Sequence, residues 1–227
     1  MAKSLTLAAL AGMIDHSLLR ADAREADLLQ LCREAVDHGF ATVAINTAPV
    51  SFCARQLAGT CVGVCAAVGF PLGQVSTAVK VYEAEQAIAD GASEIAFVIN
   101  IGQLKSGRRS YVENEIVALA KACGGVTTKV IMENCYLTDA EKQQVVEMAI
   151  DAGADFIKTS TGRGTGGATM PDVLLMRSLA RSRIRIKAAG GIRTLDRMLA
   201  FVDAGADRIG TSHGLAIMAS AREVLPE

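Results

Sequence analysis

The chain contains 227 residues, of which 51% are apolar, and its 23 basic and 24 acidic side chains give a formal net charge of −1. This length suits one large domain or two small ones, and the apolar content suits a substantial core. A charge so close to zero excludes a general electrostatic field that would recruit nucleic acid or an anionic membrane. Any anionic ligand must therefore be bound by local geometry, which indicates a small-molecule partner.

Cysteine spacing and hydropathy indicate a reducing compartment. None of the six cysteines forms a CxxC pair, and Cys61 and Cys65 belong to an apolar run that predicts a buried strand, so we expect mostly reduced core residues. No apolar stretch approaches the ~20 residues of a membrane span. The short apolar patch before Asp15 has no convincing signal-peptide cleavage site. The expected location is cytoplasmic.

One phrase recurs along the chain and predicts a repeated βα unit. It reads DHGFATVAIN at 37–46, DGASEIAFVIN at 90–100, DAGADFIKTSTG at 151–162 and DAGADRIGTSHG at 203–214. In each copy a glycine that tolerates positive φ ends a helix, and a β-branched run begins a strand a few residues later. Self-similarity of this kind is typical of a repeat architecture.

Extended to the whole chain, the pattern predicts eight strands joined by amphipathic helices. The predicted strands are Met13–Ser17, Thr42–Asn46, Val62–Gly69, Glu94–Asn100, Lys129–Asn134, Phe156–Thr161, Arg183–Ala189 and Arg208–Thr211. The predicted helices are Glu25–Asp37, Ser76–Asp90, Tyr111–Cys123, Asp139–Asp151, Pro171–Arg181 and Leu195–Ala204. Short apolar strands alternating with helices imply a parallel sheet. Eight units favour a closed TIM (β/α)8 barrel in which residues 1–227 form a single catalytic domain, with an open doubly wound sheet as the alternative.

Two lysines on neighbouring strands are the strongest candidates for chemistry. Lys158 lies inside the sixth predicted strand and Lys187 near the end of the seventh, at the strand ends where such barrels carry their active sites. The structural alternative is an ion pair with a carboxylate such as Asp15 or Glu133. Two neighbouring ammonium groups and burial instead favour the neutral amine of one lysine. A neutral amine is nucleophilic and forms a Schiff base with an aldehyde.

Glycine-rich segments follow the last three predicted strands. They are residues 162–167, the pair Gly190 and Gly191, and residues 210–214. Loops after strands seven and eight form the usual phosphate site of this architecture, with backbone N–H groups directed at the anion, and Arg163 adds a cation. The alternative is that these glycines only form the ordinary turns that connect strands and helices. Clustering at three consecutive strand ends favours the phosphate site.

The histidines do not predict a metal site. His16, His38 and His213 have no ligand-like spacing, and no nucleophile-elbow pattern is present. His38 lies at a helix end, where we expect it to be solvated. His16 and His213 lie near strand ends, where they are candidates for substrate contact.

Taken together, several motifs resemble those of one enzyme family. In chain order they are MIDHSLL, AAVGFPLGQ, EIxxVINIG, KVIMENCYLT, DFIKTSTGxGTGGAT, IKAAGGIRT and RIGTS, from about residue 13 to residue 214. This series resembles the deoxyribose-phosphate aldolases. The resemblance implies a class I aldolase (a lyase) of the TIM-barrel fold that needs no metal or organic cofactor. It also implies a role in deoxyribose phosphate catabolism, the reversible cleavage of 2-deoxy-D-ribose 5-phosphate into acetaldehyde and D-glyceraldehyde 3-phosphate.

The resemblance also implies a role for individual residues. Lys158 is implied to be the Schiff-base lysine, and Lys187 the second lysine that lowers its pKa and takes part in proton transfer. Asp15 and Lys129 fall among the family's supporting polar residues around the substrate. The residues implied to bind the substrate phosphate are Gly162, Arg163, Gly190, Gly191, Gly210, Ser212 and His213.

One position departs from the family's motif. On the fourth strand the family carries an aspartate that shuttles protons with the second lysine and a water, and Ala96 stands in its place. General acid–base assistance is typically worth about 10²–10⁴-fold, so its loss is expected to slow enamine formation while sparing the imine. His213 and Asn46 also depart, since the family more often has serine or another small residue at the first position and many members have cysteine at the second.

Three functional hypotheses follow from this departure. The first is a working aldolase in which Glu133, Lys187, His213 or water replaces the missing carboxylate. The second is a redirected catalyst, natural or engineered, that uses the Lys158 iminium for chemistry such as conjugate addition to an unsaturated aldehyde. The third is a barrel that binds sugar phosphates without turnover. Retention of both lysines favours the aldolase. A homodimer is the default expectation for a soluble enzyme, and the tail SAREVLPE is polar enough to be mobile.

Overall fold

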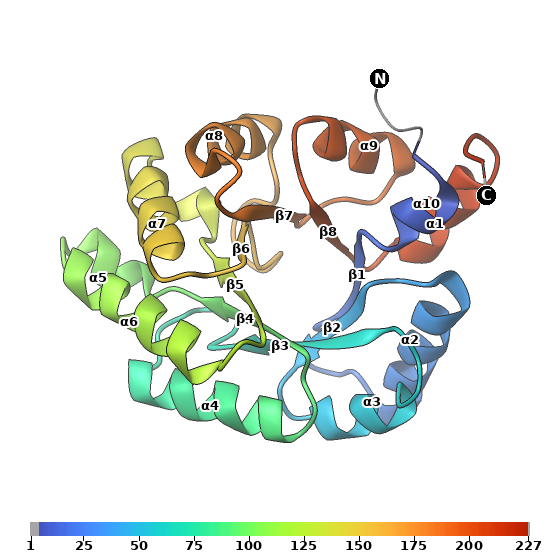
Figure 1. Cartoon of the computed structure of the whole chain (residues 1–227), viewed down its shortest axis with the longest axis horizontal. Helices are drawn as coiled ribbons and strands as arrows, with labels where there is room; N and C mark the ends of the chain where they lie inside the picture. The colour runs from blue at the N-terminus through green and yellow to red at the C-terminus, as the bar shows by residue number, and fades with distance from the viewer. Residues whose placement is uncertain (1–4, 227) are drawn as a thin grey trace.

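The computed structural model describes residues 5–226, and its eight parallel strands form a closed barrel in chain order (Figure 1). The strands are β1 Ile14–Leu18, β2 Thr42–Asn46, β3 Gly63–Val68, β4 Glu94–Val98, β5 Thr127–Ile131, β6 Phe156–Lys158, β7 Arg185–Ala189 and β8 Arg208–Thr211. The ring closes where β8 pairs with β1. The predicted (β/α)8 barrel is confirmed, and the open doubly wound alternative is wrong.

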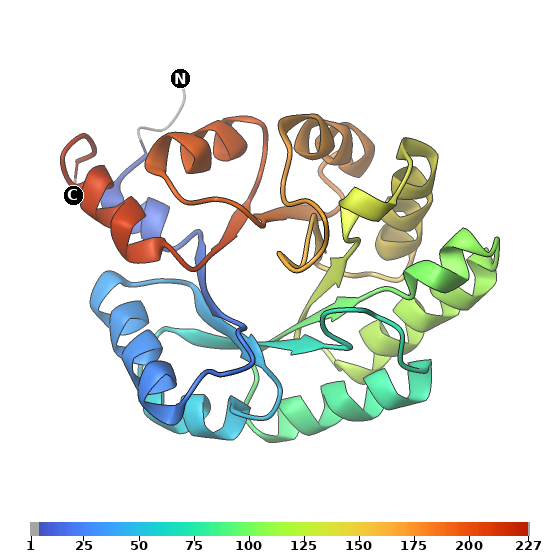
Figure 2. The ribbon, with the colours of Figure 1, turned by 180° about the vertical axis from the view of Figure 1, so that it is seen from behind.

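Helices surround the strands on the outside of the ring (Figures 1 and 2). They are α1 Leu7–Ala11, α2 Glu25–His38, α3 Val50–Gln56, α4 Thr77–Ala89, α5 Ile101–Lys105, α6 Arg109–Ala122, α7 Asp139–Asp151, α8 Met170–Ala180, α9 Leu195–Asp203 and α10 Gly214–Ala221, with a 3-10 turn, η1, at Asn134–Tyr136. The sequence pattern missed α1, α3, α5 and α10. The first three are too short to repeat an apolar stripe, and α10, with the sequence GLAIMASA, has little polar face to define one.

Local capping explains where the helices near β6 begin. Thr138 and Glu141 form a capping box at the start of α7, in which each side chain accepts a hydrogen bond from the other residue's backbone N–H. Thr169 caps α8, and Pro171 occupies its first turn. These signals fix the two helices that flank β6 and so constrain the loop that follows it.

The fifth strand lies earlier in the chain than predicted. It covers Thr127–Ile131 rather than Lys129–Asn134. Glu133 adopts a φ of 43°, which no extended strand contains, and the chain passes directly into η1. The prediction that Lys129 and Glu133 share one strand is therefore wrong.

The sixth strand is shorter than predicted, and the residues after it form side-chain hydrogen bonds. It ends at Lys158 instead of Thr161. The hydroxyl of Thr159 donates to the carbonyl of Ala189, and the backbone N–H of Thr161 donates to the carboxylate of Glu133. The backbone of Thr159 still bonds to Lys187 and Asn134, and side-chain bonds replace the backbone ladder at Thr161.

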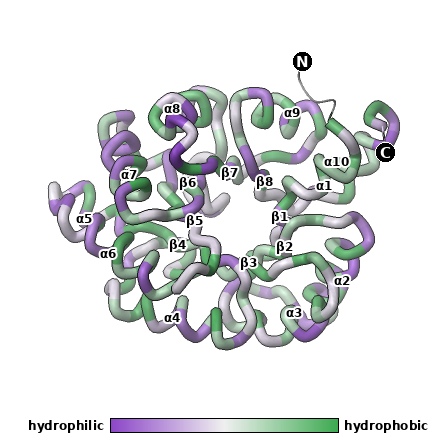
Figure 3. Tube along the Cα trace, in the orientation of Figure 1, coloured by the Kyte–Doolittle hydropathy of each residue, from purple (hydrophilic) through white to green (hydrophobic). Residues whose placement is uncertain are grey.

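Most of the buried apolar side chains lie between the strands and the outer helices. Along the outer helices, hydrophobic and hydrophilic residues alternate (Figure 3). On β4, Ile95 and Phe97 belong to this outer core, while Ala96 belongs to a smaller apolar cluster. Successive side chains of a strand point to opposite faces, so Ala96 faces the barrel interior. The buried members of the smaller cluster are Ala44, Cys65, Ala96, Val98 and Ile131.

The last described residues lie against the first helix. The backbone N–H of Leu7 donates to the carbonyl of Pro226 at 2.8 Å, and Leu225 packs against the core. The tail to residue 226 therefore has a defined position beside α1. Within residues 5–226, every helix is too short or too polar to cross a membrane.

All six cysteines lie in the described part of the chain, and each is a free thiol. Cys61 and Cys135 are exposed and the others are buried. The prediction that Cys61 belongs to a buried strand is wrong, because β3 begins only at Gly63.

Candidate active site

Lys158 and Lys187 lie side by side at the same level of two adjacent strands. In the register of β6 and β7, Lys158 is opposite Lys187. Their side chains are 5% and 1% exposed. Lys158 lines a cavity, and Lys187 reaches a buried carboxylate. The two lysines singled out by the sequence are therefore neighbours.

The environment of Lys158 favours its neutral amine. Burial lowers the pKa of Lys158, and the neighbouring charge of Lys187 lowers it further, to about 7. An ordinary lysine has a pKa of about 10.4. A substantial fraction of Lys158 is therefore unprotonated near neutral pH, and only the unprotonated amine attacks a carbonyl.

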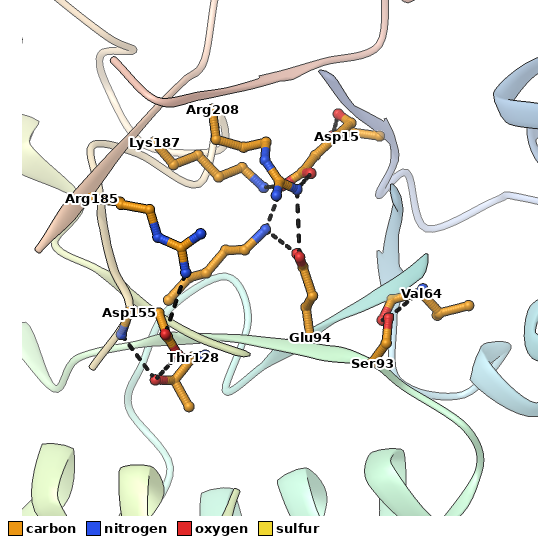
Figure 4. Close-up of polar contacts among 11 residues, drawn as sticks. Asp15, Val64, Ser93, Glu94, Thr128, Asp155, Arg185, Lys187 and Arg208 are labelled. Carbon is orange, nitrogen blue, oxygen red and sulfur yellow. Dashed lines mark hydrogen bonds and ion pairs between the residues drawn. The ribbon is translucent and has the colours of Figure 1, made fainter. Parts of the chain in front are cut away.

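Asp15 on β1 is the centre of a buried group of charges (Figure 4). Its Oδ2 accepts hydrogen bonds from Lys187 and, at 2.6 Å, from Lys129, while its Oδ1 accepts one from Arg208 at 2.6 Å. Burial opposes the charge of Asp15, but the three cations outweigh burial and hold its pKa well below the usual range. The ionised carboxylate fixes the ammonium of Lys187 beside Lys158.

Lys129 on β5 differs from Lys158 in its partners. It is fully buried and forms ion pairs with both Asp15 and Glu94. Burial opposes its charge, but Asp15, Cys65 and Glu94 outweigh burial and raise the pKa of Lys129 above its usual value. Lys129 stays protonated and is not a nucleophile. Asp15 and Lys129 lie inside the barrel, outside the wall of the cavity that Lys158 lines.

One group of potential metal ligands lies in the same region. Oxygen or sulfur atoms of Asp15, Cys65 and Glu94 all lie within 4.8 Å of one another. Both carboxylates already form ion pairs with Lys129 and Arg208. The donor set is thus neutralised by the protein's own cations and does not fit a divalent ion.

The cavity beside Lys158 has a volume of about 270 Å³ and opens at the carboxyl ends of β6, β7 and β8. Figure 2 shows the segment after β6, in orange, curling over the centre of the ring. The wall of the cavity contains all the residues that the sequence assigned to phosphate binding: Gly162, Arg163, Gly190, Gly191, Gly210, Ser212 and His213. It also contains residues that the sequence did not single out, among them Ser17, Arg193, Thr161 and Thr211.

Two matching turns shape this wall. After β6, the backbone N–H of Arg163 donates to the hydroxyl of Thr161 at 2.9 Å. After β8, the backbone N–H of His213 donates to the hydroxyl of Thr211, also at 2.9 Å. In both turns a threonine hydroxyl accepts a hydrogen bond from the backbone N–H two residues later, although Thr161 and Thr211 occupy different positions of the repeated phrase. Two turns of similar geometry therefore line the same cavity.

A close backbone contact joins the loops after β6 and β7. A Cβ on Gly167 would lie 2.3 Å from the carbonyl oxygen of Gly190. Gly190 itself has a φ of +93°, and its carbonyl accepts a hydrogen bond from Ala168 at 3.0 Å. Only glycine fits both positions, which explains why the two glycine-rich segments occur together.

The histidines lie in different environments. His213 lines the cavity, and its contact with substrate stays a prediction. His16 is buried, and its Nε2 lies 2.8 Å from the carboxylate of Glu34 on α2, on the outer side of the barrel. The expectation that His16 contacts substrate is therefore not met, because neighbouring strand residues alternate and Asp15 takes the inward position.

Ala96 lies opposite Ala67 on one side and Lys129 on the other in the strand register. It is 2% exposed and packs within the inner apolar cluster. Ala96 therefore brings no ionisable group to this level of β4, although Lys129 lies opposite it on β5.

Sequence reasoning missed two members of the charge group. Glu94 and Arg208 are the first residues of β4 and β8, far from the strand ends where chemistry is usually sought. Each lies two residues before an inward position of its strand and so points inward as well: Glu94 before Ala96, and Arg208 before Gly210. A charged residue in an inward phase is the signal that could have found them.

Comparison with known proteins places the chain in a family. Residues 9–220 match the DeoC/LacD family aldolases. A deoxyribose-phosphate aldolase from Streptococcus pneumoniae is 52% identical over 205 residues, covering 90% of this chain and 93% of that protein. Another, from Carboxydothermus hydrogenoformans, is 49% identical over 213 residues, covering 92% and 93%. The tetrameric deoxyribose phosphate aldolase from Aeropyrum pernix has a TM-score of 0.90 and 33% identity, covering 96% of this chain and 93% of its own. This chain belongs to the DeoC/LacD family of aldolases, which are carbon–carbon lyases.

Proposed function

We propose that this aldolase reversibly cleaves 2-deoxy-D-ribose 5-phosphate into acetaldehyde and D-glyceraldehyde 3-phosphate through a Schiff base on Lys158. The observation that carries the proposal is the position of Lys158. It is a buried lysine with a pKa of about 7, in the wall of a cavity formed by glycine-rich loops. Relatives at about half identity bear the name of this activity.

The amine of Lys158 supplies the covalent chemistry. It attacks C1 of the open-chain sugar, and loss of water gives an iminium ion. The iminium accepts the electron pair of the C2–C3 bond as that bond breaks and the C3 hydroxyl loses its proton, which releases D-glyceraldehyde 3-phosphate. Protonation of the remaining enamine at C2 and addition of water then release acetaldehyde and the free amine.

Proton transfer is assigned to Lys187 and its partner Asp15. Ala96 has no ionisable group, and the carboxylate of Glu133 already accepts two hydrogen bonds from Thr161. Lys187 is opposite Lys158 in the strand register, and the ionised Asp15 orients its ammonium group. A donor held next to the reacting carbon is the geometric requirement of general acid catalysis.

The phosphate of the substrate is assigned to the wall made by the loops after β6, β7 and β8. Backbone N–H groups of glycine-rich loops bind phosphate through their partial positive charge. The guanidinium groups of Arg163 and Arg193 add full charges to the same wall. The residues proposed to bind phosphate are Gly162, Arg163, Gly190, Gly191, Gly210, Ser212 and His213.

The redirected-catalyst and binding-only hypotheses find no support in the comparisons. The family matched by residues 9–220 consists of aldolases, and the curated relatives bear the name of the cleavage activity.

A coupled assay tests the proposal. Cleavage of deoxyribose 5-phosphate by the wild-type chain is measured through reduction of the glyceraldehyde 3-phosphate that it releases. The account expects turnover that is abolished in Lys158→Leu and retained in Lys105→Leu, a lysine that forms a surface pair with Glu141. Absence of turnover in the wild-type chain would refute the assigned substrate.

We further propose a homodimer that acts in the cytoplasm. Leu72, Val79 and Tyr82 are 70%, 51% and 68% exposed, and the last two share one face of α4. Free thiols at all six cysteines suit a reducing compartment. Light scattering coupled to size exclusion distinguishes a dimer from a monomer or from a tetramer like that of the Aeropyrum pernix enzyme.

A further inference from the structure

Glu133 is a buried carboxylate outside the group of charges centred on Asp15. It is 2% exposed and lies between β5 and η1. Its backbone has a φ of 43°, a conformation that non-glycine residues adopt only where the surroundings hold them. The aldol chemistry assigned to Lys158 and Lys187 does not use this residue.

The carboxylate of Glu133 is connected to the cavity wall through one side chain. Its Oε1 accepts a hydrogen bond from the backbone N–H of Thr161 at 3.2 Å, and its Oε2 accepts one from the hydroxyl of Thr161. That hydroxyl in turn accepts a hydrogen bond from the backbone N–H of Arg163 at 2.9 Å. Hydrogen bonds to a carboxylate are stronger than those between neutral groups. Glu133 therefore holds the turn that carries Arg163.

The loop also packs directly on Glu133. A Cβ on Gly164 would lie 3.0 Å from Cδ of Glu133 and 2.9 Å from Sγ of Cys135. The loop is thus in contact with the segment after β5 on one side, while Gly167 meets Gly190 on the other. Its position depends on both contacts.

The matching turn after β8 is held differently. The hydroxyl of Thr211 donates to the backbone carbonyl of Ile192 at 2.6 Å. Any side chain at position 192 supplies that carbonyl, whereas the turn after β6 depends on the identity of residue 133. Of the two turns, the one after β6 is thus the one that bonds to a side chain from another βα unit.

We propose that Glu133 is a positioning residue that sets affinity for the phosphate end of the substrate, acting through Thr161 on the turn at Arg163. The inference rests on the proposed function, which assigns the phosphate to this wall. Imine formation at Lys158 does not require the turn, so loss of the contact separates phosphate recognition from covalent chemistry.

The test compares Thr161→Val and Glu133→Gln with wild type on two substrates, deoxyribose 5-phosphate and unphosphorylated 2-deoxyribose. Valine matches the shape of threonine and removes the hydroxyl. Thr128→Val is the matched control, because Thr128 is also a buried threonine whose hydroxyl bonds a carboxylate, that of Asp155, at the opposite end of the barrel. Thr161→Ser restores the hydroxyl.

The expected result is a rise in KM for deoxyribose 5-phosphate of about ten- to one-hundred-fold in Thr161→Val and a smaller rise in Glu133→Gln, the size of effect that loss of positioning produces. The value of kcat/KM for 2-deoxyribose is expected to change less than about threefold, as in Thr128→Val, and Thr161→Ser should recover wild-type KM. An equal loss of kcat/KM on both substrates would overturn the inference. So would kinetic constants that are unchanged on both substrates.

Binding of inorganic phosphate, measured by calorimetry on the same proteins, separates this inference from the proposed function. A wild-type chain that binds phosphate but does not cleave the sugar would contradict the proposed substrate alone. Weaker phosphate binding in Thr161→Val would still support the role of Glu133, and unchanged binding would refute it.

Discussion

Asp15 and Lys187 lie 172 residues apart in the sequence, and their side chains form a buried ion pair inside the barrel. Lys187 is also opposite Lys158, so one ammonium group connects the carboxylate to the nucleophile. The pair holds Lys187 in place, and the charge of Lys187 helps to lower the pKa of Lys158. The reactivity of Lys158 on β6 thus depends on a carboxylate on β1, three strands away around the closed ring.

Removal of this carboxylate is expected to affect both stability and activity. Asp15→Asn leaves Lys187, Lys129 and Arg208 without their shared partner, and breaking a buried ion pair typically costs about 3–5 kcal/mol. Urea unfolding should show this loss, together with a marked fall in kcat. The matched control is Asp22→Asn, because Asp22 pairs with Arg20 at the surface. A stability loss in Asp15→Asn no larger than in the control would contradict the central role of Asp15.

The lowered pKa of Lys158 predicts the pH dependence of imine formation. The neutral amine reacts, so the rate of acetaldehyde adduct formation should rise with pH through about 7 and reach a plateau above it. Acetaldehyde has no titrating phosphate, which keeps the profile simple. In Lys187→Met the neighbouring charge is absent, so the rise should move to higher pH. A profile in Lys187→Met that is unchanged or moves to lower pH would show that Lys187 does not lower the pKa of Lys158.

Restoration of a carboxylate at position 96 is expected to raise turnover. Ala96→Asp supplies an acid–base group on β4, and such a group typically contributes about 10²–10⁴-fold. Ala96→Asn is the control, since it has nearly the same shape and cannot exchange a proton. The two variants are compared by kcat for deoxyribose 5-phosphate. If Ala96→Asp raises kcat no more than Ala96→Asn does, Lys187 and Asp15 already supply the proton path.

The close contact of the two glycine-rich loops gives another test. A Cβ at Gly190 meets the Cα of Gly167 at 2.9 Å, and its φ of +93° disfavours any side chain. Gly190→Ala should therefore raise KM for deoxyribose 5-phosphate by about ten- to one-hundred-fold. Gly153→Ala is the control. Gly153 has a similar positive φ of +73°, a Cβ there would meet nothing within 4 Å, and the residue lies outside the cavity wall. If both variants raise KM equally, backbone strain rather than the loop contact is responsible.

The sequence predicted the barrel and the two lysines well, because these depend on local and repeated signals. The phrase that ends each helix and begins the next strand repeats through the chain, and lysines inside apolar strands are conspicuous. All seven residues assigned to phosphate line one cavity. These features need no knowledge of how distant strands meet.

Other parts of the site depend on closure of the ring. The pairing of Asp15 with Lys129, Lys187 and Arg208 joins four strands, and no sequence pattern states which inward charges will meet. The end of β5 was missed for a different reason. The backbone of Glu133 is held by its contacts with Thr161, which come from the next βα unit.

The most direct test of the account is covalent trapping at Lys158. Acetaldehyde and borohydride are added to the wild-type chain and to Lys158→Leu, and the adduct is located by intact mass and peptide mapping. The account predicts one reduced adduct per wild-type chain, on Lys158, and loss of that adduct in the variant. An adduct that persists in Lys158→Leu, or that maps to Lys187 in the wild-type chain, would contradict the assignment of the nucleophile.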